Sequence, residues 1–313
     1  MGLLGIVTSV APYVTRANAL EALAMAHEDG FSGVELNEDH LHCLAAALPS
    51  SLDLMRQFAQ DHDMINSLHG TLHLPSLDSE NSSARRSAVE YTLKTLDFME
   101  QAAIPRIVLH SFSDLPAFFR LRGERANGPA YLVGCHAVKT YGLLAPVLKK
   151  YRTWRAEKLH RNFLLSLSEI ASHASEKRVN GEAIQIVFEE HYSDAMDYDE
   201  VPYGKGKFAN VIRGIDSAHH YIRTGRDSDL SHLDGPIHFH AVDTNGTLDD
   251  HRTVGTGRVN IDKILLQILA RRLTDFIVIE DGNRASALRS KAALETHLRR
   301  RQIVGSSFRK SNS

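Results

Sequence analysis

The stretch IHFHAVDTNGTLDDH, residues 237–251, brings several metal-binding side chains together in one short segment. It opens with an apolar run in which His238 and His240 occupy alternate positions, and an alternating strand places both imidazoles on one face. The Asx and Gly residues that follow predict a loop, which ends at Asp249 and His251. Side chains that can ligate a metal therefore lie at the end of a strand and on the loop after it, where α/β enzymes usually keep their catalytic groups.

Carboxylates and imidazoles also end other apolar runs. Glu189 follows IQIVF and Glu280 follows FIVI, and charges at such positions are rarely buried unless they are paired or bound to a metal. Asp216 ends a further run, and a turn would direct the imidazole of His219 back toward it. The candidate metal ligands are nine residues: His69, His110, Glu189, Asp216, His219, His240, Asp249, His251 and Glu280.

These residues need a scaffold that brings strand ends together. Short apolar runs alternate with helical patterns, which predicts βα units and a parallel sheet. The eight expected strands are Leu3–Val7, Gly33–Leu36, Ile65–His69, Arg106–His110, Ile184–Glu189, Val211–Asp216, Ile237–His240 and Phe276–Glu280. They favour an α/β fold of the (β/α)8 TIM barrel type, in which the carboxyl ends of all strands meet at one mouth. A lone imidazole is more often hydrogen-bonded in a wall than bound to metal, but nine metal-capable residues at one mouth predict a metal site.

The ligand types limit the metal. Imidazole and carboxylate ligands without thiolate suit Zn, Mn, Fe or Co, and suit Mg less well. Catalytic zinc commonly takes about three protein ligands and a water, so we expect one to three divalent ions per chain, with zinc favoured. Weaker candidates for contact with a substrate are Glu35, His73, Glu190, His238 and Asp243.

Composition and charge are typical of a soluble globular protein. With 313 residues, 43% hydrophobic and 24% charged, the chain can form one large domain, which we expect over residues 1–304. The net charge of −2 argues against binding polyanions through bulk charge. The two cysteines, Cys43 and Cys135, provide no disulfide framework, which favours a reducing compartment, the cytoplasm. The apolar N-terminal run has no basic n-region and is too short to span a bilayer, so we expect no membrane segment.

One connection is longer than a βα crossover needs. Residues 113–151, after the fourth strand, are predicted to be an insertion, because compact domains seldom contain loops of this length. The insertion and the start of the following helix are basic, with aromatic residues such as Tyr141 and Trp154 interleaved. The segment is either a lid that recognises an anionic group or a charge-rich solvated face. Residues 305–313 are predicted to form a disordered tail.

Several motifs together resemble those of the xylose isomerase-like TIM barrels, which include endonuclease IV and many sugar isomerases and epimerases. The motifs are GFSGVEL, SLHGTLHLP, VLHS, VFEEH, DSAH, HAVD, DDH, GTG and VIED, and they cover nearly the whole chain except the insertion and the tail. The resemblance implies that Glu189, Asp216, His240 and Glu280 match the four ligands of the single divalent ion in the isomerases and epimerases. It also implies that the other five candidates complete what is a three-zinc cluster in endonuclease IV.

The sequence departs from endonuclease IV at three places. Leu72 stands where that enzyme has an aromatic residue that occupies the space of a lost base. The segment NEDH, residues 37–40, has no counterpart of its DNA-contacting arginine, and Ser111 and Phe112 stand in place of Pro-Gly after the fourth-strand histidine. These differences argue against DNA as the substrate and leave the metal site unchanged.

Two enzymatic mechanisms fit the resemblance. In the first, which we favour at this point, a multinuclear site hydrolyses a phosphoester of a sugar-phosphate or nucleic-acid-like substrate, and Glu189 positions a bridging water. In the alternative, one ion polarises a carbonyl of a sugar or sugar phosphate, while Glu189 and Glu280 act as acid and base across the α-carbon. A barrel that binds a ligand without chemistry is a third hypothesis, which leaves the convergence of so many acid and imidazole groups unexplained.

Overall fold

The computed structural model describes the chain in eight segments. These are residues 4–13, 19–48, 50–70, 77–110, 157–190, 198–224, 228–246 and 249–310. The predicted basic insertion and His73 lie outside the described residues.

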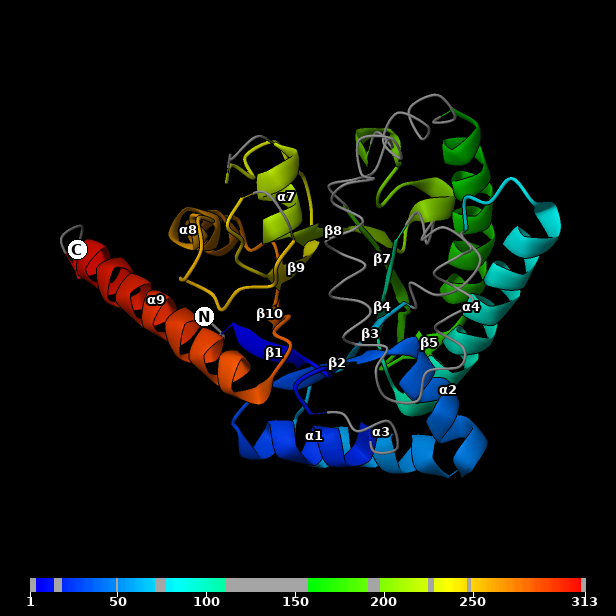
Figure 1. Ribbon diagram of the computed structural model, residues 1–313, viewed down its shortest axis with the longest axis horizontal. Coiled ribbons are helices and arrows are strands. Elements are labelled where there is room, and N and C mark those ends of the chain that lie inside the picture. The colour runs from blue at the N-terminus through cyan, green and yellow to red at the C-terminus, as the bar shows by residue number, and fades with distance from the viewer. Residues whose placement is uncertain are drawn as a thin grey trace.

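Eight parallel strands close into a barrel in the order β1-β10-β9-β8-β7-β4-β3-β2 (Figure 1). Their bounds are Gly5–Ser9 (β1), Gly33–Asn37 (β2), Ser67–His69 (β3), Arg106–Leu109 (β4), Gln185–Glu189 (β7), Val211–Asp216 (β8), Ile237–Ala241 (β9) and Phe276–Ile279 (β10). β1 pairs with both β2 and β10, and this pairing closes the sheet. The predicted barrel is confirmed, and each strand overlaps its expected range.

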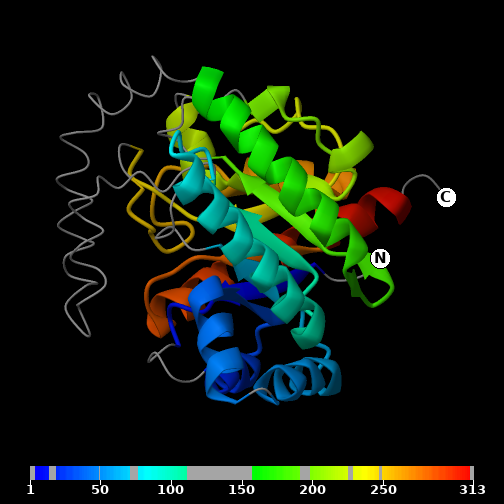
Figure 2. The same cartoon turned by 90° about the vertical axis from the view of Figure 1, so that its right-hand side faces the viewer.

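Helices surround the strands on the outside of the barrel (Figures 1 and 2). Their bounds are Ala19–Glu28 (α1), Glu38–Ala47 (α2), Ser51–Asp61 (α3), Ser82–Ala102 (α4), Ser217–Arg223 (α7), Ile261–Arg271 (α8) and Arg284–Lys310 (α9), and a further helix covers residues 157–176. The described residues also form two short 3-10 helices, Tyr198–Glu200 and Gly206–Phe208, and a hairpin of β5 (Arg178–Val179) and β6 (Glu182–Ala183). Residues 305–310 of the predicted tail lie within α9. No helix in the described segments is long and apolar enough to cross a membrane.

Capping side chains and apolar stripes explain where the helices form. The Asn81 side chain accepts hydrogen bonds from the backbone amides of Ser83 and Ala84 at the start of α4, and Asn260 caps α8 in the same way. Such caps satisfy amide groups that have no partner within the helix. α8 buries Ile261, Ile264, Leu265 and Ile268, a stripe with helical spacing that faces the strands.

Alternate side chains along each strand point outward to the helices and inward to the barrel interior. The outward residues join the helices in one large apolar core, in which the rings of Phe163 and Phe188 lie 4.4 Å apart. The inward residues form small separate clusters, one of which contains Val108 and Val187. Since side chains alternate along a strand, Glu189 lies on the same inward face as Val187. The barrel interior is therefore lined by apolar side chains at the level of Val108 and Val187. At the carboxyl ends of the strands it is lined by ionisable side chains.

Candidate metal centre

The carboxyl ends of six strands carry six of the nine candidate ligands. His69 and Glu189 are the last residues of β3 and β7, Asp216 is the last of β8, and His240 lies in β9; His110 and Glu280 directly follow β4 and β10. Because the strands are parallel and the sheet is closed, these ends meet at one mouth. His219 comes from α7, and Asp249 and His251 come from the loop after β9.

Glu189 occupies the centre of the cluster. Its Oε1 lies 3.3 Å from Nδ1 of His240, and its Oε2 lies 3.4 Å from Nε2 of His110 and 3.7 Å from Nε2 of His69. Oε1 of Glu280 also lies 3.3 Å from Nδ1 of His240. One nitrogen of His240 therefore faces both candidate catalytic carboxylates.

Asp249 joins the loop to this cluster. Its Oδ2 lies 3.1 Å from Nε2 of His219 and 3.1 Å from Nε2 of His251. Nδ1 of His219 lies 3.6 Å from Oε1 of Glu189. Nδ1 of His251 donates a hydrogen bond of 3.0 Å to the backbone oxygen of Glu280 and lies 3.9 Å from Oε2 of the same residue. The side chain of His251 is 43% exposed, whereas that of His219 is 7% exposed. His251 thus forms the outer edge of the cluster.

Asp216 links the cluster to the start of α7. Its Oδ1 accepts a hydrogen bond of 2.7 Å from the backbone amide of His219 and caps the helix. This cap places His219 in the first turn of the helix, where its Nε2 lies 3.1 Å from Oδ2 of Asp249. All nine candidate ligands predicted from the sequence are therefore brought together at the mouth.

Within the described segments, three sets of ligand atoms lie close enough to hold a metal ion. Within each set the atoms are within 4.8 Å of one another, and the sets are Glu189, Asp216 and His240; His69, His110 and Glu189; and Glu35, His69, His240 and Glu280. Buried atoms in the cluster without a hydrogen-bond partner among the described residues include Oε2 of Glu189, Oδ2 of Asp216 and Nδ1 of His240. Buried polar atoms are costly when unpaired, so this donor set fits a divalent cation.

Burial and neighbouring carboxylates shift the pKa values of the cluster in opposite directions. Burial lowers the pKa of His69, but Glu189 and Glu280 outweigh it and raise that pKa to about 9. Burial lowers the pKa of His110 to about 3, because Glu189 compensates only in part. Burial raises the pKa of the Asp216 carboxyl to about 7, despite the opposing effect of His219. Such divergent values within one cluster are typical of functional sites.

Glu35 and His238 lie inside the barrel and are fully buried, at 1% and 0% exposure. Glu35 Oε2 accepts a hydrogen bond of 2.7 Å from the Ser67 hydroxyl and lies 2.9 Å from Nε2 of His238. Its Oε1 lies 3.1 Å from Nε2 of His240. Sequence reasoning did not single out Ser67, although its position two residues before His69 places it on the same inward face.

Glu190 and Asp243 have partners within the chain. Glu190 points away from Glu189 and lies between the guanidinium groups of Arg213, at 3.2 Å, and Arg223. Asp243 accepts backbone hydrogen bonds of 2.7 to 3.0 Å from the amides of residues 244, 255, 257 and 259. A Cβ atom at Gly257 would lie 2.2 Å from Oδ1 of Asp243, so the GTG segment can pack here only with glycine at that position.

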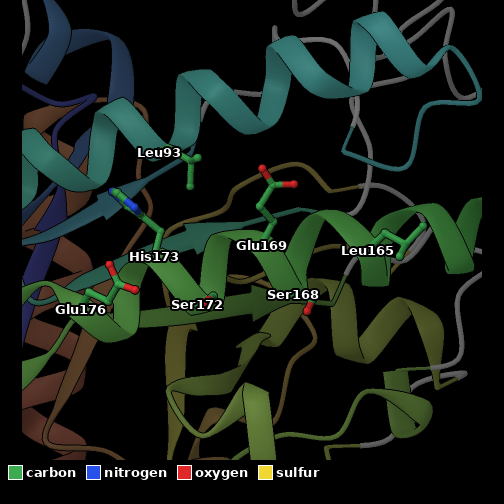
Figure 3. Close-up of a pocket in the computed structure, with 7 residues that line it drawn as sticks. All are labelled: Leu93, Leu165, Ser168, Glu169, Ser172, His173 and Glu176. Carbon is green, nitrogen blue, oxygen red and sulfur yellow. The ribbon is translucent and has the colours of Figure 1, made fainter.

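A pocket of about 440 Å³ lies on the outer helices (Figure 3). It is lined by α4 and the helix over residues 157–176, with Leu93, Leu165, Glu169 and His173 among its residues. None of the nine candidate ligands lines this pocket.

The sequence matches the family described as xylose isomerase-like TIM barrel over residues 23–301. A search of curated proteins gives no match. Among solved structures, a D-tagatose 3-epimerase-like protein is similar with a TM-score of 0.65 and 18% identity, covering 97% of this chain and 100% of its own. A 3-keto-D-glucoside 4-epimerase from E. coli is similar with a TM-score of 0.62 and 17% identity, covering 94% of this chain and 100% of its own. A D-psicose 3-epimerase studied in the presence of D-fructose has a TM-score of 0.59 and 16% identity, covering 89% of this chain and 85% of its own.

Proposed function

Because this chain belongs to the xylose isomerase-like TIM barrel family, we propose that it is a divalent-metal-dependent epimerase or isomerase of sugars. The observation that carries the proposal is the placement of two carboxylates beside one imidazole. Oε1 of Glu189 and Oε1 of Glu280 each lie 3.3 Å from Nδ1 of His240. Epimerisation next to a carbonyl needs a base to remove a proton and an acid to return one, and a pair of carboxyl groups supplies both.

The ligands of the ion would be Glu189, Asp216, His240 and Glu280. When bound, a divalent ion would polarise the carbonyl and the neighbouring hydroxyl of the sugar. Glu189 and Glu280 would then exchange the proton on the carbon beside the carbonyl. Closure of the barrel around Glu189, whose side chain is 2% exposed, would keep bulk water from this carboxylate.

The remaining imidazoles would bind the sugar. The side chain of His251 at the outer edge is partly exposed, and its ring contacts Asp249 and the backbone of Glu280. Hydroxyl groups of a sugar are suitable partners for imidazole and carboxylate groups at such an edge. Three similar structures carry the names of sugar epimerases or epimerase-like proteins, and one was studied with D-fructose. They support a free ketose as the substrate over a phosphorylated one.

Phosphoester hydrolysis, which the sequence favoured, is the second candidate. The set of His69, His110 and Glu189 is a specific observation in its favour, because a second ion there would form a multinuclear site. The similar structures give no support to a phosphorylated substrate or to DNA. We therefore place the epimerase function first.

The test is a substrate screen on protein stripped of metal and reloaded separately with Mn, Co, Mg or Zn. We expect conversion of at least one free ketose to an epimer or aldose, and loss of this conversion when the metal is removed. Phosphodiesters and abasic DNA form the second arm of the screen. Hydrolysis of a phosphoester, with no conversion of any ketose by the same metal-loaded protein, would overturn the proposal.

A further inference from the structure

We propose that Glu35 is a positioning residue that fixes the imidazole of His240 with Nδ1 as the metal-binding nitrogen. This inference rests on the metal site of the proposed function. It assigns a task to a fully buried carboxylate of β2, on the other edge of the His240 ring from Glu189.

The two edges of the His240 ring face different carboxylates. Nε2 lies 3.1 Å from Oε1 of Glu35, whereas Nδ1 lies 3.3 Å from the Oε1 atoms of Glu189 and Glu280. His240 and Glu35 are each 1% exposed, so water does not compete for either edge of the ring. The two nitrogens of the ring thus face different carboxylates, and an oxygen of Glu35 lies within 4.8 Å of one of Glu280.

Two groups lie beside Nε2 of His240: Oε1 of Glu35 at 3.1 Å and Nε2 of His238 at 3.0 Å. Nε2 of His238 also lies 2.9 Å from Oε2 of Glu35, to which it can donate its own proton. A carboxylate is an acceptor, so Glu35 favours the tautomer of His240 in which Nε2 carries the proton. In that tautomer, Nδ1 keeps its lone pair, and this lone pair faces Glu189 and Glu280. Carboxylates that hold the second nitrogen of a ligating histidine also restrict the ring orientation and make the imidazole a stronger ligand.

Glu35 is itself held by two further side chains. Oε2 accepts a hydrogen bond of 2.7 Å from the Ser67 hydroxyl and lies 2.9 Å from Nε2 of His238. These contacts come from β3 and β9, two strands that are not neighbours in the barrel. They fix Glu35 from two directions, so its Oε1 has little freedom to leave His240.

Glu35 also satisfies the distance requirement for a direct ligand, in the set with His69, His240 and Glu280. Its contacts favour the positioning role. One oxygen already accepts from Ser67, and the other lies next to Nε2 of His240. An ion at Oε2 would have to displace the Ser67 hydroxyl and the His238 ring from a fully buried position.

The first experiment measures metal affinity by competition with a chromophoric chelator, using purified full-length protein and Zn or Mn. We expect Glu35→Gln to bind the same number of ions as the unmodified protein but with affinity lowered about 10- to 100-fold, the usual effect of removing a carboxylate partner of a ligating histidine. The unfolding temperature of the metal-free protein is measured in parallel. The control is Glu38→Gln, because Glu38 is also 1% exposed but its carboxylate accepts a hydrogen bond from Thr95 on α4.

The outcomes separate this inference from the proposed function. Metal affinity within about twofold of the unmodified protein in Glu35→Gln would overturn the positioning role. Loss of a whole equivalent of metal at saturation would show that Glu35 is a ligand, which also overturns it. A protein that binds no divalent metal even without substitution would contradict the proposed function itself.

A second measurement needs no change at Glu35, in case that variant fails to fold. The unmodified protein is labelled with ¹⁵N-histidine and loaded with ¹¹³Cd, and the signal of His240 is assigned by its absence in His240→Gln. We expect one-bond cadmium coupling at Nδ1 and a proton on Nε2. Coupling at Nε2 would overturn the inference.

Discussion

Asp243 provides a direct test of how the loop after β9 is held. The residue is fully buried, and its two carboxylate oxygens accept four backbone hydrogen bonds, from residues 244, 255, 257 and 259. In Asp243→Asn, one oxygen becomes an amide nitrogen, which cannot accept, so two of the four amides face a donor. Hydrogen bonds to a charged group contribute about 1.5–3 kcal/mol each. The expected loss in free energy of unfolding is therefore about 3–6 kcal/mol.

This loss is large against the total stability of a domain, which is about 5–15 kcal/mol. Urea denaturation followed by circular dichroism measures it, and the loss should be accompanied by weaker metal binding, because the same loop carries Asp249 and His251. The control is Asp250→Asn in the same loop, since Asp250 is partly exposed and bonds to Arg252 near the surface. A loss below about 1 kcal/mol in Asp243→Asn, with lost substrate affinity, would refute the structural role and restore the predicted substrate contact.

Three further predictions follow from the site and the scaffold. Glu189→Gln and Glu280→Gln should each lower kcat at least about 100-fold, the usual minimum for a lost acid or base, and activity within tenfold of the unmodified enzyme would contradict their roles. His251→Ala should keep its metal content, measured by elemental analysis, and raise KM; loss of one ion per chain would instead favour the multinuclear hydrolase. The hydrogen bonds from Arg284 lower the pKa of Asp29 below its ordinary value of 3.8. The ionised Asp29 carboxylate therefore stabilises the folded state above pH 3.8, and this stabilisation is lost as the pH falls through the lowered pKa. Thermal unfolding of Asp29→Asn should therefore differ from that of the unmodified protein at pH 7 and converge with it in strong acid, and an equal difference at both pH values would contradict the pairing.

The sequence was sufficient for the barrel and for the cluster at its mouth. The alternation of His238 and His240 placed both imidazoles inward, as observed, because side chains alternate along any strand. The closed parallel sheet then brought Glu189, His240 and Glu280 together, since the strand ends of a barrel have only one mouth to share. Strand limits differed by a residue or two, because hydrogen-bond pairing with neighbours sets them.

Other assignments depend on contacts between distant parts of the chain. Glu190 could have been placed outside the mouth, because it follows Glu189 directly and must point to the opposite face. Its pairing with Arg213 and Arg223 involves other elements and has no local pattern. The same holds for Asp243, whose partners lie up to sixteen residues further along the chain. Turn composition predicted a loop there, but not which side chain would hold it.

Solvent deuterium incorporation during sugar conversion tests the proposed proton transfer most directly. Metal-loaded protein is incubated in D₂O with a panel of free ketoses, and product is followed by ¹H and ¹³C NMR. If Glu189 and Glu280 exchange the proton, we expect deuterium on the carbon beside the carbonyl at the inverted centre, and none in Glu189→Gln or Glu280→Gln. Conversion that proceeds at full rate without deuterium in the product, or that is unaffected by both substitutions, would contradict the proposed proton transfer at these carboxylates.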